Sequence, residues 1–157
     1  MAEQTTSSIV VDAAPEEVMA VIADFEAYPR WVQGMKRVEV LDEGAPAASY
    51  SRAHRVHFDL EQAPIKDSYT LEYDWSGDAD GAGTRRTVAW DLVEGKMLKA
   101  MEGAYLLRPS EGGTEVTYRL AVDVSIPMIG MLKRKAEKVI IDTALKGLKK
   151  RVESQPG

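Results

Sequence analysis

The feature that most constrains this chain is an alternation of apolar and polar residues that runs from Lys36 to Val124. Residues 65–75 place mostly aromatic and aliphatic side chains on one face and charged or hydroxyl side chains on the other, and residues 115–124 repeat the pattern. A period of two is typical of β-strands, and clean alternation indicates an antiparallel sheet with one covered and one solvated face. The segment therefore predicts a sheet whose apolar face needs a covering layer.

The covering layer is predicted by the last segment of the chain, where the period changes at Pro127. Apolar residues then recur at helical spacing over about six turns and form one stripe. The stripe consists of Ile129, Leu132, Ala136, Val139, Ile140, Thr143, Ala144, Leu148 and Val152. Such a helix is roughly 35 Å long at about 1.5 Å per residue, and we expect its stripe to lie on the covered face of the sheet.

The residues before the alternation predict a strand and two short helices. Residues 4–11 alternate as a strand does, and Pro15 followed by two glutamates suits the first turn of a helix. Tyr28-Pro29 is expected to end that helix, because the residue before proline is disfavoured in the α region. A second short helix is expected around residues 30–32. The predicted fold class is therefore α+β, with a curved antiparallel sheet of about seven strands, two short helices after strand 1 and a long C-terminal helix over the sheet.

The length of 157 residues is that of one domain, which we expect to extend over residues 1–157 with its core at about 5–152. The chain contains no cysteine, so disulfides, iron–sulfur clusters, cysteine-type zinc sites and thiol nucleophiles are excluded. The two histidines, His54 and His57, are three positions apart in a predicted strand and therefore point to opposite faces. We expect neither a metal nor a cofactor.

Charge is distributed unevenly along the chain. The net charge is −5, but residues 130–157 hold eight basic and three acidic residues, and the rest of the chain carries −10. An acidic protein is a poor match for nucleic acid. Neither a signal peptide nor an apolar run of about 20 residues is visible, so we expect a cytoplasmic protein that is a monomer or a weak homodimer.

The basic residues of the C-terminal segment mostly take the side of the helix opposite its apolar stripe. We interpret that side as a solvated face, with Glu137, Asp142 and Glu153 among its charges. Transient contact with an anionic membrane surface, or with an acidic partner, is the alternative interpretation.

Short motifs are spread over nearly the whole chain. They are Ile9 and Val11, Ala14-Pro15-Glu16-Glu17-Val18, Asp24, Tyr28-Pro29 with Trp31, Asp74-Trp75, the strand 86–94, Gly103 and Gly113-Thr114-Glu115-Val116-Thr117-Tyr118. With the terminal helix, they resemble the START-like, helix-grip (SRPBCC) superfamily, in particular its polyketide cyclase/dehydrase and coenzyme Q-binding-like branch. The resemblance implies an apolar cavity between sheet and helix that binds lipids, polyketides, isoprenoids or hormones, with cyclisation or aromatisation in some members.

Large apolar side chains on the predicted inner face, and at the mouth of the cavity, are the candidate ligand-binding residues. They are Trp31, Tyr69, Tyr73, Trp75, Trp90, Met101, Tyr105, Tyr118, Met128, Met131 and Leu132. An apolar wall with a few hydroxyl and indole donors suits a largely hydrophobic ligand, and methionine adapts to irregular shapes. The alternative interpretation is plain core packing.

Arg52 and His54 are the polar candidates for the same site. Alternation places them on the face of Phe58, so they are predicted to point inward and to anchor a ligand carboxylate or carbonyl, with His54 as a candidate acid or base. A buried arginine needs a partner, and Asp67 is a candidate for it across the strands. The alternatives are an edge strand whose side chains reach water, and a one-residue bulge that exchanges the two faces.

These patterns leave three functional interpretations. The leading one is non-catalytic binding or carriage of a hydrophobic small molecule (a lipid, an isoprenoid or a polyketide-like molecule), since no catalytic constellation such as a Gly-x-Ser-x-Gly elbow is present and no catalytic residue is assigned. The second is a polyketide aromatase or cyclase, which requires Arg52, His54 and Tyr69 to converge in the cavity. The third is an interaction or regulatory module that uses the basic helix and has a small or filled cavity.

Overall fold

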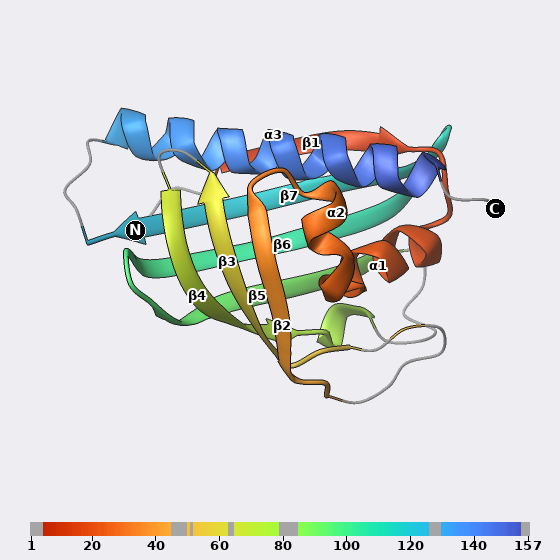
Figure 1. Cartoon of the computed structure of the whole chain (residues 1–157). Coiled ribbons are helices and arrows are strands. Elements are labelled where there is room, and N and C mark those ends of the chain that lie inside the picture. The colour runs from red at the N-terminus through yellow and green to blue at the C-terminus, as the bar shows by residue number, and fades with distance from the viewer. Residues whose placement is uncertain are drawn as a thin grey trace.

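The strands and helices follow one another in the order that the periodicity predicts. The computed structural model describes residues 5–44, 50, 52–62, 65–78, 85–125 and 130–154. The elements are β1 (Thr5–Val11), α1 (Pro15–Ala23), the 3₁₀ helix η1 (Phe25–Ala27), α2 (Tyr28–Trp31), β2 (Met35–Asp42), β3 (Arg55–Gln62), β4 (Ile65–Asp74), the 3₁₀ helix η2 (Ser76–Asp78), β5 (Arg86–Gly95), β6 (Leu98–Ser110), β7 (Gly113–Val124) and α3 (Gly130–Ser154). Figure 1 shows a curved sheet with α3 along it.

The seven strands form one antiparallel sheet in the order β1-β7-β6-β5-β4-β3-β2. Strands β2 to β6 each pair with the next strand along the chain. β1 pairs with β7, where Thr5 lies opposite Leu120 and Val11 opposite Thr114. The first and last strands are therefore neighbours, and β2 forms the other edge. The prediction of about seven antiparallel strands with a long C-terminal helix is confirmed.

The short helices α1 and α2 lie at one end of the sheet (Figure 1), but the break between them comes earlier than predicted. α1 extends from Pro15 to Ala23, and the backbone of the next residue, Asp24, leaves the helical region at φ −85° and ψ 70°. Tyr28 adopts helical angles of φ −51° and ψ −41° and begins α2, so Tyr28-Pro29 starts a helix instead of ending one. Proline is tolerated there because the first N–H groups of a helix have no acceptor within it.

α3 packs against β1, β7 and α1, and its apolar residues form two adjacent strips instead of one. The buried strip consists of Ile141, Leu145, Leu148 and Val152. Successive residues of a helix are rotated by about 100°, so the residues next to this strip in the sequence face a different direction. Ile140, Thr143 and Ala144 form a second strip, which lines the cavity described below. The predicted stripe merged the two strips, and its inclusion of Leu132, which is 49% exposed, is wrong. No helix within the described ranges is long and apolar enough to cross a membrane.

Glu137 fastens α3 to the sheet. Its side chain is only 2% exposed. One carboxylate oxygen accepts a hydrogen bond from the Thr5 hydroxyl on β1 at 2.5 Å, and the other accepts one from the backbone N–H of Val122 on β7 at 2.8 Å. The expectation that Glu137 belongs to a solvated face is therefore wrong, because this carboxylate turns toward the sheet while most basic residues of the helix face outward.

Glu137→Ala is expected to lower the free energy of unfolding by about 2–3 kcal/mol, because the buried N–H of Val122 and the Thr5 hydroxyl both lose a charged acceptor. Glu153→Ala removes an exposed carboxylate from the same helix and is expected to cost less than about 1 kcal/mol. Urea unfolding followed by circular dichroism measures both values. Equal losses in the two variants would show that Glu137 does not hold α3 on the sheet.

Candidate ligand cavity

A cavity of about 70 Å³ lies between the inner face of the sheet and the helices α2 and α3. It is lined by Tyr28, Val32, Gln33, Met35, Phe58, Leu60, Tyr69, Leu71, Tyr73, Trp90, Met101, Tyr105, Tyr118, Ile140, Thr143 and Ala144. Most of these side chains come from alternate residues of β3 to β7, which the two-residue period turns to one face. None of these described lining residues is charged, so the cavity favours an apolar and uncharged occupant.

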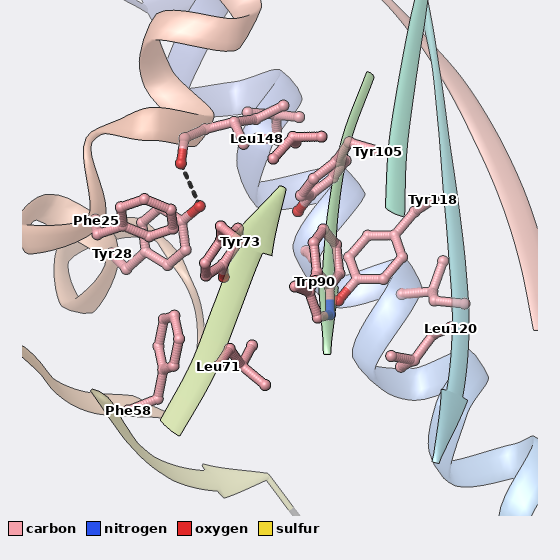
Figure 2. Close-up of a cluster of buried hydrophobic side chains, with 14 of the residues drawn as sticks. Phe25, Tyr28, Phe58, Leu71, Tyr73, Trp90, Tyr105, Tyr118, Leu120 and Leu148 are labelled. Carbon is pink, nitrogen blue, oxygen red and sulfur yellow. Dashed lines mark hydrogen bonds between the residues drawn. The ribbon is translucent and has the colours of Figure 1, made fainter. Parts of the chain in front are cut away.

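Seven of the sixteen described residues that line the cavity are aromatic. The ring centroids of Tyr105 and Tyr118 are 4.7 Å apart, and the Trp90 indole lies 5.4 Å from the first and 5.5 Å from the second. Figure 2 shows these three rings as one group, with Tyr73 between that group and Tyr28. The contacts are tilted or T-shaped, as the charge distribution of aromatic rings favours. Rigid rings held in this way leave space that flexible side chains would fill.

Gly103 makes room for the Trp90 indole. The two residues lie opposite each other in the pairing of β5 with β6. A Cβ atom on residue 103 would lie 2.4 Å from two carbons of the Trp90 ring, so a larger residue fits only if the indole moves. The glycine therefore fixes the position of this ring in the cavity wall.

Gly103→Val is expected to push the Trp90 indole into the cavity and to lower the free energy of unfolding by about 1–3 kcal/mol, the usual cost of overpacking. Ala104→Val changes the next residue, on the other face of β6, and is expected to be close to neutral. Near-ultraviolet circular dichroism reports the environment of the indole, and urea unfolding gives the stability. An unchanged tryptophan signal in Gly103→Val would contradict the role given to this glycine.

Tyrosine hydroxyls are the main polar groups of the cavity. Tyr28 donates a hydrogen bond to the backbone carbonyl of Ile22, drawn as the dashed line in Figure 2. The hydroxyls that have no hydrogen-bond partner in the part of the chain that the structure describes belong to Tyr69, Tyr73, Tyr105 and Tyr118. Burial raises the pKa of all five phenols above the usual value, so they stay protonated at neutral pH. Each of the four can donate one hydrogen bond to a ligand and accept another.

None of the six tyrosines of the chain is expected to ionise near pH 10 in the folded protein. Burial raises the pKa of the five cavity phenols, and burial followed by the Asp78 carboxylate raises the pKa of Tyr50 to about 12. The unfolded chain ionises at about 10, so stability is full below that pH and falls as the pH rises further. Phenolate absorbance during a pH titration measures the ionisation of the tyrosines, and circular dichroism shows when the protein unfolds. A tyrosine that ionises near pH 10 while the protein is still folded would contradict the burial of these side chains.

Six of the predicted binding residues line this cavity, and two lie beside it. The six are Tyr69, Tyr73, Trp90, Met101, Tyr105 and Tyr118. Trp31 packs on Tyr28 with ring centroids 5.0 Å apart, and the Trp75 indole N–H donates to the carbonyl oxygen of Ala53 at 2.7 Å. Contact of any of these residues with a ligand stays a prediction.

The remaining apolar candidates come from the segment at the start of α3. Met131 is 71% exposed and Leu132 is 49% exposed, so their assignment to the cavity wall is wrong. At about 100° per residue, Leu132 lies opposite the buried strip of the helix, and Met131 lies opposite the strip that lines the cavity. Met128 lies outside the described residues.

Arg52 does not reach the cavity, and its assignment as an inward anchor is wrong. β3 begins only at Arg55, so the alternation does not extend back to residue 52. Arg52 instead contacts the fully buried carboxylate of Asp78, with Nε 3.3 Å from Oδ2, and Arg86 contacts the same carboxylate at 3.0 Å. Tyr50 also donates a hydrogen bond to it. The arginine therefore belongs to a structural ion cluster beside η2.

His54 lies on the outer surface, so its predicted place in the cavity is also wrong. Its two ring nitrogens are each 3.2 Å from a carboxylate oxygen, one from Asp42 and one from Glu72. The hydrogen bond with Asp42, and then that with Glu72, raises the pKa of His54. A histidine held in this way supplies no acid or base to the cavity. No group of three histidine or acidic side chains in the described ranges is arranged to hold a metal ion.

Asp67 does not pair with Arg52 across the strands, as the sequence suggested. It is 7% exposed and accepts hydrogen bonds from the backbone N–H groups of Lys96 at 3.0 Å, Met97 at 3.1 Å and Leu98 at 2.8 Å. The carboxylate therefore holds the turn between β5 and β6, and its role is structural.

The sequence prediction missed the other lining residues. They are Tyr28, Val32, Gln33, Met35, Phe58, Leu60, Leu71, Ile140, Thr143 and Ala144. Phe58 and Leu71 share the two-residue period of the predicted aromatic residues, so that signal was present. Gln33 follows α2 in a turn and carries no periodic signal.

The sheet wrapped along one long helix, with an aromatic cavity between them, defines a helix-grip protein of the START-like class. The chain belongs to the family described as polyketide cyclase/dehydrase and lipid transport, whose sequence profile matches residues 2–153. The resemblance found in the sequence motifs is thereby confirmed. Comparison with curated proteins found no match.

Solved structures share the fold over nearly their whole length. A START superfamily protein from Mycobacterium smegmatis has a TM-score of 0.81 at 20% identity, covering 96% of this chain and 97% of its own. A protein from Thermus thermophilus has a TM-score of 0.75 at 22% identity, and the match covers 97% of this chain and 98% of the other. The ZhuI aromatase/cyclase from a Streptomyces species has a TM-score of 0.74 at 17% identity, and the match covers 98% of this chain and 94% of the other. At these identities the similarity shows the fold alone.

Proposed function

We propose that this protein binds a small hydrophobic molecule in the cavity and holds an oxygen atom of that molecule with tyrosine hydroxyls. The observation that carries the proposal is an uncharged aromatic wall with four hydroxyls that no described residue engages. A hydroxyl at the surface of the cavity can donate a hydrogen bond to a ligand oxygen and accept one from a ligand hydroxyl, and such a bond contributes about 0.5–1.5 kcal/mol. Burial of the apolar part of the ligand, at about 25 cal/mol per Å², supplies the affinity.

The volume of the cavity limits which part of a ligand fits. Small-molecule sites commonly enclose about 300–1,000 Å³, whereas this cavity has about 70 Å³. As it stands, the space suits a group of about the size of one ring. A larger group requires movement of the flexible side chains of Met35 and Met101. The interpretation of the chain as an interaction module also predicts a small cavity. Binding of a ligand in the cavity is therefore the test that separates the two interpretations.

Catalysis of ring closure is the second candidate, and one observation favours it. The tyrosine hydroxyls can donate hydrogen bonds to a carbonyl oxygen whose negative charge grows in a transition state. Cyclisation of a ketone chain also needs a proton acceptor, and the described lining residues include no histidine, carboxylate or amine. The former candidates Arg52 and His54 lie outside the cavity. Binding is therefore the function that we propose.

Native mass spectrometry of the freshly purified protein, followed by solvent extraction, tests the proposal on whatever the protein retains. We expect a reproducible additional mass that the extraction removes and that belongs to an apolar molecule with at least one oxygen. A clean apoprotein mass, combined with failure of the probe described next, would overturn the proposal.

Acetophenone, one ring with one carbonyl, is expected to bind in the cavity and to shift the NMR methyl signals of Met35 and Met101. Ethylbenzene has a similar shape without the oxygen and is expected to bind about two- to tenfold more weakly, since a hydrogen bond contributes about 0.5–1.5 kcal/mol. Equal affinities for the two probes would show that the tyrosine hydroxyls do not hold the ligand.

Ala144→Leu is expected to fill the cavity and to weaken acetophenone binding at least about tenfold, which corresponds to about 1.4 kcal/mol. Ala136→Leu makes the same change at a buried position of α3 that does not line the cavity. We expect that control to lose about 1–3 kcal/mol of stability through overpacking and to retain the probe. Titration by NMR and urea unfolding separate the two effects, and undiminished binding in Ala144→Leu would place the probe elsewhere.

A further inference from the structure

Gln33 and Thr143 line two spaces at once. One is the cavity, and the other is a groove of about 430 Å³ on the outer side of α3. Gln33 is exposed, so the cavity approaches the surface at this residue. The groove therefore continues the cavity outward, between the turn that follows α2 and the middle of α3.

The contact between α2 and α3 closes the wall beside this opening. A Cβ atom on Gly147 would lie 2.6 Å from the backbone oxygen of Trp31, so the two helices touch there through the bare backbone of the glycine. Trp31 and Gly147 both belong to the groove and not to the cavity. The path from the cavity thus passes between Gln33 and Thr143 and then along the outer face of α3.

The groove is basic, whereas the cavity is uncharged. Lys146 and Lys150 lie one turn apart, both are exposed, and neither ammonium has a carboxylate within 4 Å among the residues described. The acidic residue of the groove, Asp142, already pairs with Lys138 Nζ at 3.2 Å. Two cations that no described carboxylate neutralises therefore lie at the mouth of an apolar cavity.

We propose that the ligand is amphipathic, with a ring-sized apolar end in the cavity and a carboxylate at its other end beside Lys146 and Lys150. This inference rests on the proposed function and specifies the class of its ligand. The cavity excludes an ionised group because its wall offers no counter-charge. The groove leaves the carboxylate in water and places two cations next to it. The charged end of the ligand thus has one favourable location.

The test uses ω-benzoylalkanoic acids of increasing chain length, each compared with its neutral primary amide by isothermal titration calorimetry. At low ionic strength, the acid of the best chain length is expected to bind about three- to tenfold more tightly than its amide. The preference is expected to shrink at about 1 M salt, where the screening length is about 3 Å. The double variant Lys146→Ala/Lys150→Ala is expected to bind the amide normally and to lose the preference for the acid.

The control is the double variant Lys99→Ala/Lys135→Ala, which removes the same charge from exposed lysines outside the groove. It is expected to keep the preference for the acid. Equal affinities of acid and amide for the wild type, or equal effects of the two double variants, would overturn the inference and leave the proposed function standing. Failure of acetophenone and of every amide to bind would overturn the proposed function itself, so the two failures are distinguishable.

Discussion

A single helix is too narrow to cover a sheet of seven strands, and this mismatch determines the interior of the protein. Strands lie about 4.8 Å apart, so seven of them span about 30 Å, whereas a helix with its side chains is about 10–12 Å wide. α3 packs on β1 and β7 at one edge of the sheet. The inner face of the other strands is covered by large rings and by the short helices at the end of the sheet. The cavity is the space that these rigid rings leave.

The fold was predictable because each strand keeps one face in water, and a two-residue period records that directly. The same reasoning failed in part on α3. Its apolar side meets two surfaces, the sheet with α1 and the cavity, and adjacent residues such as Ile140 and Ile141 fall on different ones. Periodicity identifies apolar positions but not which apolar surface each one meets. The prediction for Glu137 failed for a related reason. A charged residue in a sequence is expected to face water, and the two hydrogen-bond donors that hold this carboxylate against the sheet come from distant strands.

The aromatic part of the site was predictable for the same reason as the sheet, because Tyr69, Tyr73 and Trp90 occupy inward positions of regular strands. The polar part was not. Arg52 precedes β3, and outside a strand the alternation of residues carries no information about direction. Gln33 lies in the turn after α2 and Thr143 lies on α3. Their positions beside the cavity depend on how these segments pack against the sheet, which periodicity does not record. The sequence therefore predicted much of the aromatic wall and a mouth near Trp31, but not Gln33 and Thr143, which line both the cavity and the groove.

The helix beside the mouth of the cavity is short and contains one unsatisfied polar group. α2 contains four residues, and the indole N–H of its Trp31 is buried without a hydrogen-bond partner in the described chain. A buried N–H without an acceptor costs about 1–3 kcal/mol, and a hydrogen bond to water would remove that cost. Gly34, at φ +89°, supplies a backbone conformation that other residues adopt only with strain. The buried indole N–H thus offsets part of the free energy that the aromatic contacts of α2 contribute at the end of the cavity where Gln33 meets the basic groove.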